Sequence, residues 1–187
     1  MQSPSLAQQH HTFAAEFIRV AGGVSDLTAA TPVPEWDVRG LLEHMIWFHD
    51  FVHGGSPFGW TRRVDPAVDP VGAFVEQTAA VQNILDDPAQ AESPFFHPMA
   101  SGQSLGEATA RFYVSDVVMH TWDLARATAQ EVTFDEPYVA GLSAGMQAQE
   151  ATLRASGQFG AAQPVSDDAD PLTRLMAFLG RDPHFGR

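Results

Sequence analysis

The stretch Ser104–Thr128, SLGEATARFYVSDVVMHTWDLARAT, is the longest segment of helical period in the chain, and it decides the fold class. Ser104 and Glu107 have the spacing of a capping box, which satisfies two backbone N–H groups at the start of a helix. Asp116 and His120 are four residues apart, so they share one face of the predicted helix. Polar groups at core depth are costly unless they are paired or bind a ligand. This face is therefore the first candidate for a functional site.

Segments of helical period also lie on both sides of this stretch. They cover about residues 4–22, 37–52, 70–85, 136–156 and 171–179, separated by Pro- and Gly-rich connections, and only residues 131–134 have the composition of a short strand. Four long helices with short connections predict an all-α, antiparallel four-helix bundle. We expect the bundle to span residues 1–157, and a short C-terminal helical appendage, residues 158–187, to pack against it.

The composition excludes several classes of protein. The chain has 187 residues, which fits one domain with a buried core. Its formal net charge of −13 argues against nucleic-acid phosphates and against an anionic membrane surface as partners. It contains no cysteine, which excludes disulfides, a thiolate nucleophile and a cysteine zinc site. There is no signal-peptide pattern and no run of about 18 apolar residues, so we expect a cytoplasmic protein without a membrane span.

A histidine in the predicted second helix can complete a metal site. His44 has Leu41 at i−3 and Phe48 at i+4, so it is expected to point into the core. Alone, such a histidine is more often a hydrogen-bonded core residue, and an Asp-x-x-x-His pair is often an ordinary intrahelical interaction. Together, His44, Asp116 and His120 offer three N/O ligands with open positions. That arrangement is typical of catalytic metal sites, so the combination favours a divalent metal ion.

Four other histidines in the N-terminal third offer weaker candidates. His49 and His53 also stand four residues apart, but they point roughly opposite to His44, so both sets cannot serve one site. We interpret them as surface or helix-end residues, or as the rim of a pocket. His10 and His11 are expected to be solvated near the N-terminus.

One acidic side chain has two interpretations of about equal weight. Asp123 follows His120 at i+3 and precedes Arg126 by three residues. It could orient the imidazole of a metal-binding His120 from behind, as carboxylates do around many metal sites. It could instead form an ordinary salt bridge with Arg126. The role of Asp123 therefore stays open at this level.

Two motifs resemble those of the DinB-like metalloproteins. Residues 36–44, WDVRGLLEH, resemble the W-[TD]-V-R-[DE]-L-x-x-H start of the second helix in that superfamily. Residues 116–128, DVVMHTWDLARAT, are similar to the [DE]-x-x-x-H-x-W-D-L-A-R-A-T helix of an actinobacterial branch. That branch is related to the metal-binding domain of mycothiol-dependent maleylpyruvate isomerase. The run from Phe159 to Pro183 is similar to its tail, so the resemblance covers nearly the whole chain.

The resemblance implies a DinB-like bundle, often a homodimer, that holds a divalent metal through His44, Asp116 and His120. Zinc is the expected ion and nickel the alternative. It further implies a transferase or isomerase that acts on a small electrophile with a low-molecular-weight thiol such as mycothiol. The chain lacks the full C-terminal domain of the isomerase, which argues against isomerase activity itself. The alternatives are a non-catalytic metal- or ligand-binding bundle, acting as an interaction or stress-response module, and a purely structural polar core. Neither catalytic nor thiol-binding residues are identified.

Overall fold

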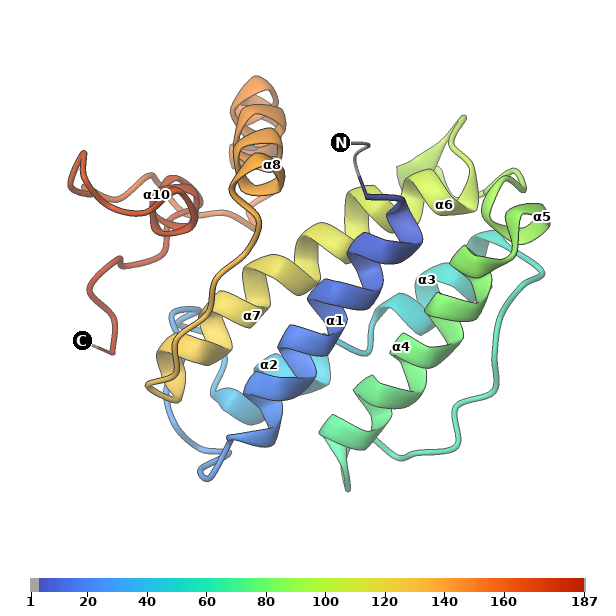
Figure 1. Cartoon of the computed structure of the whole chain (residues 1–187), viewed down its shortest axis with the longest axis horizontal. Coiled ribbons are helices and arrows are strands. Elements are labelled where there is room, and N and C mark those ends of the chain that lie inside the picture. The colour runs from blue at the N-terminus through green and yellow to red at the C-terminus, as the bar shows by residue number, and fades with distance from the viewer. Residues whose placement is uncertain (1–3, 187) are drawn as a thin grey trace.

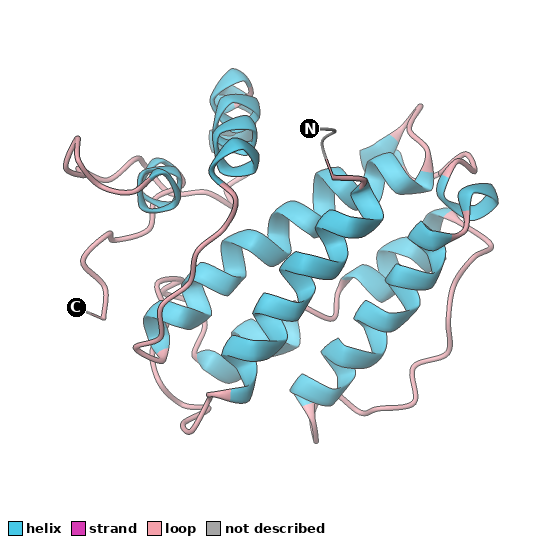
Figure 2. Ribbon diagram, viewed as in Figure 1, coloured by secondary structure: helices cyan, strands magenta, loops and turns pink. Residues whose placement is uncertain are grey.

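The computed structural model describes residues 4–186, and the regular structure in this range is helical (Figure 1, Figure 2). It confirms the predicted all-α, DinB-like bundle. The bundle segments are α1 (Leu6–Gly22), α2 (Val38–His44) with α3 (Phe48–Gly55), α4 (Pro70–Asp86), and α6 (Leu105–Ala108) continued by η2 (Thr109–Val114) and α7 (Ser115–Ala127). Residues 131–134, the one segment with the composition of a short strand, form no strand; the β-structure among the described residues is limited to isolated bridges.

Shorter helices connect and extend the bundle. The segments α5 (Pro88–Ala91) and η1 (Pro98–Ala100) link α4 to α6. After α7 the chain forms α8 (Glu136–Ala148), α9 (Glu150–Ala155) and α10 (Pro171–Phe178). Figure 1 shows α8 and α10 on one side of the bundle, where they contact each other. No helix in the described part of the chain is long and apolar enough to cross a membrane.

Side-chain caps explain where the bundle helices begin. The capping box predicted at Ser104 and Glu107 is present, because each side chain accepts a hydrogen bond from the backbone N–H of the other. Asp37 caps α2 by accepting from the N–H of Gly40 at 2.8 Å. Caps of this kind contribute about 1 kcal/mol each to helix stability. The cap at Asp37 fixes the start of the helix that ends at His44.

Aromatic pairs hold the bundle segments against one another. The rings of Phe17 on α1 and Phe74 on α4 lie 4.2 Å apart between centroids, and both side chains are fully buried. Phe48 on α3 stacks on Tyr113 of η2 at 4.5 Å. Burying each such side chain stabilises the fold by about 1.5–3 kcal/mol. These contacts hold α1 against α4, and α3 against η2, the segment that continues directly into α7.

The structure corrects the expectation that His10 is solvated. His10 is only 1% exposed, because it lies on the core face of α1 with its ring against Tyr113. Its Nδ1–H donates to the amide oxygen of Gln82 at 2.7 Å, while Nε2 is buried without a hydrogen-bond partner in the described structure. His11 is exposed, as expected. The sequence has no signal that separates the two histidines except the helical period.

Candidate metal centre

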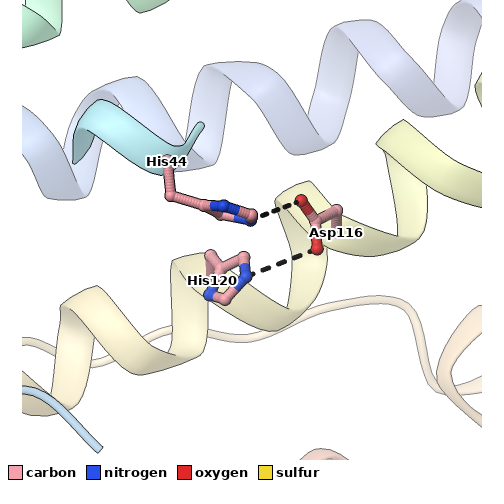
Figure 3. Close-up of side chains that lie close together, drawn as sticks. All are labelled: His44, Asp116 and His120. Carbon is pink, nitrogen blue, oxygen red and sulfur yellow. Dashed lines mark hydrogen bonds and ion pairs between the residues drawn. The ribbon is translucent and has the colours of Figure 1, made fainter. Parts of the chain in front are cut away.

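Three side chains from two separate helices converge on one point (Figure 3). His44 is the last residue of α2, and Asp116 and His120 lie one turn apart on α7. Nε2 of His44 lies 3.2 Å from Oδ2 of Asp116, and Nε2 of His120 lies 3.3 Å from Oδ1. One ligand atom from each residue falls within 4.8 Å of the others. The structure thus brings together the three residues that the sequence singled out.

The predicted second helix is broken directly after His44. The sequence predicted one helix over about residues 37–52, but residues 45–47 form a turn between α2 and α3. The buried side chain of Gln77 on α4 fills this break: its Nε2 donates to the carbonyl of Met45 at 2.7 Å, and its Oε1 accepts from the N–H of His49 at 3.0 Å. Because Gln77 replaces helical hydrogen bonds, the chain can turn immediately after His44.

An irregular helical segment precedes Asp116. Residues Thr109–Val114 are π-helical, whereas the sequence predicted a continuous α-helix over residues 104–128. A π-helical turn holds more residues than an α-helical turn, so it rotates all the residues that follow it. Such segments are frequent at functional sites. Here the segment ends directly before α7, the helix that presents Asp116 and His120 to His44.

Tryptophan side chains complete the surroundings of the site. Nε1–H of Trp47 donates to Oδ2 of Asp116 at 2.9 Å. The ring of Trp36 stacks on His44, with centroids 4.3 Å apart, and lies 5.5 Å from the ring of His120. The sequence analysis gave neither tryptophan a role at the site. The one feature of the sequence that could have indicated such a role is the position of Trp36 at the start of the WDVR motif.

Asp123 lies behind His120, which favours the first of its two interpretations. It is completely buried, and its Oδ2 accepts a hydrogen bond from Nδ1–H of His120 at 2.9 Å. The same carboxylate is contacted by the guanidinium of Arg181, which follows α10. A carboxylate bonded to one ring nitrogen leaves the other free to bind a metal, so Nε2 of His120 faces Asp116 as a possible ligand atom.

The buried charges of the site perturb one another strongly. Burial alone would raise the pKa of Asp116, but His120 and His44 outweigh it and hold this pKa well below its usual value. Burial would lower the pKa of His120, but Asp116 and Asp123 reverse the shift and raise the pKa to about 9. The site therefore favours positive charge at its centre. A divalent cation would compete with a proton for Nε2 of His120.

The donor set fits a divalent transition metal. Zinc binds histidine nitrogen and carboxylate oxygen at about 2.0–2.2 Å in tetrahedral geometry, so two donors on one ion lie about 3.3–3.6 Å apart. The three ligand atoms lie within 4.8 Å of one another, so side-chain movements of about 1 Å would bring them to this spacing. The side chain of His44 is 28% exposed and that of Asp116 15%, so the site reaches solvent on the His44 side. Three protein ligands leave coordination positions for a small molecule.

The rival histidine pair lies outside this centre. Nε2–H of His49 and Nε2–H of His53 both donate to the carbonyl of Trp60, at 3.0 and 2.8 Å. Nδ1 of His49 lies 2.7 Å from Oδ1 of Asp50. These bonds tie the loop after α3 back onto that helix. The pair is thus a surface anchor, in agreement with the interpretation from the sequence.

Comparison with known proteins agrees with the resemblance found in the sequence. Residues 8–94 match the family described as the mycothiol maleylpyruvate isomerase N-terminal domain. The match includes His44 and ends before Asp116 and His120. Two proteins of Mycobacterium tuberculosis, named uncharacterized protein Rv0738 (strain ATCC 25618 / H37Rv) and uncharacterized protein MT0763 (strain CDC 1551 / Oshkosh), are similar along almost their whole length. Each is 29% identical over 95% of this chain and 97% of its own.

No solved structure matches the chain at a comparable level of significance. The fold and the site geometry therefore rest on the structure of this chain alone. The likeness to the family rests on the sequence match. The matched segment runs from within α1 to just beyond α5, and thus includes the helix that carries His44. Residues 8–94 thus resemble the mycothiol maleylpyruvate isomerase N-terminal domains, in agreement with the DinB-like branch that the sequence motifs indicated.

Proposed function

We propose that the chain binds one divalent cation through His44, Asp116 and His120 and acts with a small thiol, of the mycothiol type, on a small electrophile. The reaction class is group transfer or isomerisation. The observation that carries the proposal is the convergence of two imidazole nitrogens and one carboxylate oxygen within 4.8 Å. The thiol is supported by the family that residues 8–94 match, which is named for a mycothiol enzyme.

The side chains at the proposed site have two roles: some bind the metal ion, and others orient the ligands. His44, Asp116 and His120 supply the ligand atoms, and Trp47 holds the carboxylate of Asp116 through its indole N–H. Asp123 holds the ring of His120 in the orientation that exposes Nε2. A bound divalent cation would supply Lewis acidity, which lowers the pKa of a coordinated thiol. Because the chain has no cysteine, the thiol has to come from a small molecule.

The donor set also argues for a particular metal. Two imidazoles and one carboxylate, with positions left open, are a frequent ligand set of catalytic zinc. Nickel accepts the same ligand types, and the order of intrinsic affinities places it close to zinc. Zinc is therefore the proposed ion and nickel the alternative.

The first experiment is elemental analysis of untagged protein purified without chelator. We expect about one divalent ion per chain, its loss in His44→Ala, and its retention in His49→Ala, which removes a histidine of the rival pair. No metal in the wild-type chain after incubation with Zn²⁺ and Ni²⁺ would refute the site. Equal loss in both variants would show that His44 has no special role.

The second experiment tests the chemistry on the metal-loaded protein. Mycothiol is added with maleylpyruvate in one arm and monochlorobimane in the other, and turnover is compared with that of His44→Ala. We expect thiol-dependent turnover that requires the metal. Bound metal without turnover in either arm would favour the second candidate, a non-catalytic metal-binding module.

A further inference from the structure

The C-terminal segment reaches the candidate metal centre through one buried arginine. Arg181 lies three residues beyond α10 and is 8% exposed. Its Nε and Nη2 lie 3.4 and 3.3 Å from Oδ1 and Oδ2 of Asp123, whose Oδ2 also accepts from Nδ1–H of His120 at 2.9 Å. We infer that Arg181 is a positioning residue of the centre: it fixes the carboxylate of Asp123, which fixes the ring of His120. This inference rests on the proposed metal site.

The contact between Arg181 and Asp123 restrains the carboxylate in a way that one hydrogen bond cannot. His120 engages only Oδ2, which leaves the carboxylate free to rotate about its bond to Cβ. Arg181 spans both oxygens, because two nitrogens of a planar guanidinium match the two oxygens of a carboxylate. Asp123 is completely buried, so without Arg181 its Oδ1 would lose its donor and its charge would lose a cationic partner. The carboxylate would then turn, and His120 would lose its orienting partner.

The fold of the tail determines where the guanidinium lies. Leu175, Met176 and Leu179 are buried in the core, and the N–H of Arg181 donates to the carbonyl of Met176 at 3.0 Å. Gly180 has a φ of +97°, and a Cβ there would lie 2.7 Å from the Cα of Gly160. The chain thus crosses itself closely just before Arg181. The tail, which the sequence predicted only to pack on the bundle, supplies a side chain to the wall of the centre.

Contacts on the other side of Arg181 hold the tail against α7. Nη2–H of Arg126, on the last turn of α7, donates to the carbonyl of Pro183 at 2.7 Å. Gly186 approaches the carbonyl of Arg126 so closely that a Cβ there would collide with it. Arg181 is therefore anchored on both sides. A displacement of the tail would be transmitted to His120 through Asp123.

The test measures zinc affinity by competition with a chromophoric chelator. In Arg181→Ala we expect affinity to fall by about 10–100-fold, the usual effect of losing a residue that supports a metal ligand. Arg181→Lys keeps the positive charge but loses the contact to both carboxylate oxygens. Its zinc affinity is therefore expected to lie between those of Arg181→Ala and wild type. The control is Arg174→Ala, an exposed arginine on α10, which is expected to leave affinity unchanged. Unchanged affinity in both Arg181 variants, with folding verified by circular dichroism, would overturn the inference.

A double-mutant cycle tests whether Arg181 acts through Asp123. If it does, Asp123→Ala combined with Arg181→Ala binds zinc no more weakly than Asp123→Ala alone. Losses that add in the double variant would show an independent effect and would contradict the inference.

A metal-free measurement separates this inference from the proposed function. If the wild-type chain binds no zinc, the proposed site fails, and nuclear magnetic resonance of His120 decides the inference instead. We expect the Nδ1–H proton of His120 to be observed in wild type and Arg174→Ala, protected by its bond to Asp123. It should be lost to solvent exchange in Arg181→Ala. A protected proton in Arg181→Ala would show that Arg181 does not position the ring.

Discussion

The substitution Gln77→Met tests how the chain turns between α2 and α3. Gln77 is 1% exposed, and its amide joins three segments. Nε2 donates to the carbonyl of Met45 at 2.7 Å and to the hydroxyl of Tyr113 at 3.2 Å, and Oε1 accepts from the N–H of His49 at 3.0 Å. Methionine has nearly the same length and flexibility but no amide. The substitution therefore removes these bonds while it fills most of the volume.

The expected cost follows from the groups that lose their partners. The carbonyl of Met45 loses its bond to Gln77 in a buried position, which costs about 1–3 kcal/mol. The N–H of His49 keeps only a 3.3 Å contact to the carbonyl of Ile46, so its loss is smaller. Together these changes lower the free energy of unfolding by about 2–4 kcal/mol. For a chain of this size that lowers Tm by roughly 4–16 °C.

Urea denaturation of the metal-free protein, followed by circular dichroism, measures this change. The control is Asn83→Met, an exposed position on the same helix, which is expected to alter stability by less than about 0.5 kcal/mol. A loss below about 0.5 kcal/mol in Gln77→Met would refute the reasoning, because the helix break would then not depend on the amide.

Two further predictions concern pH and the indole at the site. Burial lowers the pKa of His10 below its ordinary value of 6.5, so the folded state resists protonation and stability falls as pH drops below 6.5. His10→Gln should lose less stability between about pH 7.5 and about pH 5 than wild type in urea denaturation; equal losses would contradict the buried, neutral imidazole. Trp47→Phe removes the N–H that holds Asp116 and should weaken zinc binding about tenfold by chelator competition, whereas Trp60→Phe should not. Equal effects of the two tryptophan variants would exclude a specific role for the indole N–H.

Local pattern was sufficient for the positions of the main helices and for two of the three site residues. Caps and the helical period predicted the bundle segments, because both depend on residues within one or two turns of each other. Asp116 and His120 were paired for the same reason. His44 was expected to face inward through Leu41 and Phe48, but the helix ends at His44, so its i+4 neighbour lies across a turn. His44 nevertheless points inward, because Leu41, three residues before it, lies in the same helix and is buried.

The side chains that the sequence could not place act across long distances in the chain. The bond from Trp47 to Asp116 spans 69 residues, and the contact from Arg181 to Asp123 spans 58. Tryptophan and arginine have ordinary roles in cores and surface ion pairs, so neither residue type indicates such a partner. Only the packing of α2, with the turn that follows it, and of the tail against α7 brings these groups together.

The two irregularities around the site are linked by one side chain. The π-helical segment places the hydroxyl of Tyr113 against Gln77 and Thr78, and the same Gln77 amide fills the break that follows His44. A regular α-helix through residues 109–114 would turn Asp116 and His120 to another face, since each additional residue rotates a helix by about 100°. A regular helix through residues 45–47 would carry Trp47 and α3 onward in the direction of α2. The amide of Gln77 therefore joins the turn that follows His44 to the helical segment that precedes Asp116, without contacting either residue. Its loss in Gln77→Met should thus weaken zinc binding as well as the fold, whereas a substitution that only destabilises the core should affect the fold alone.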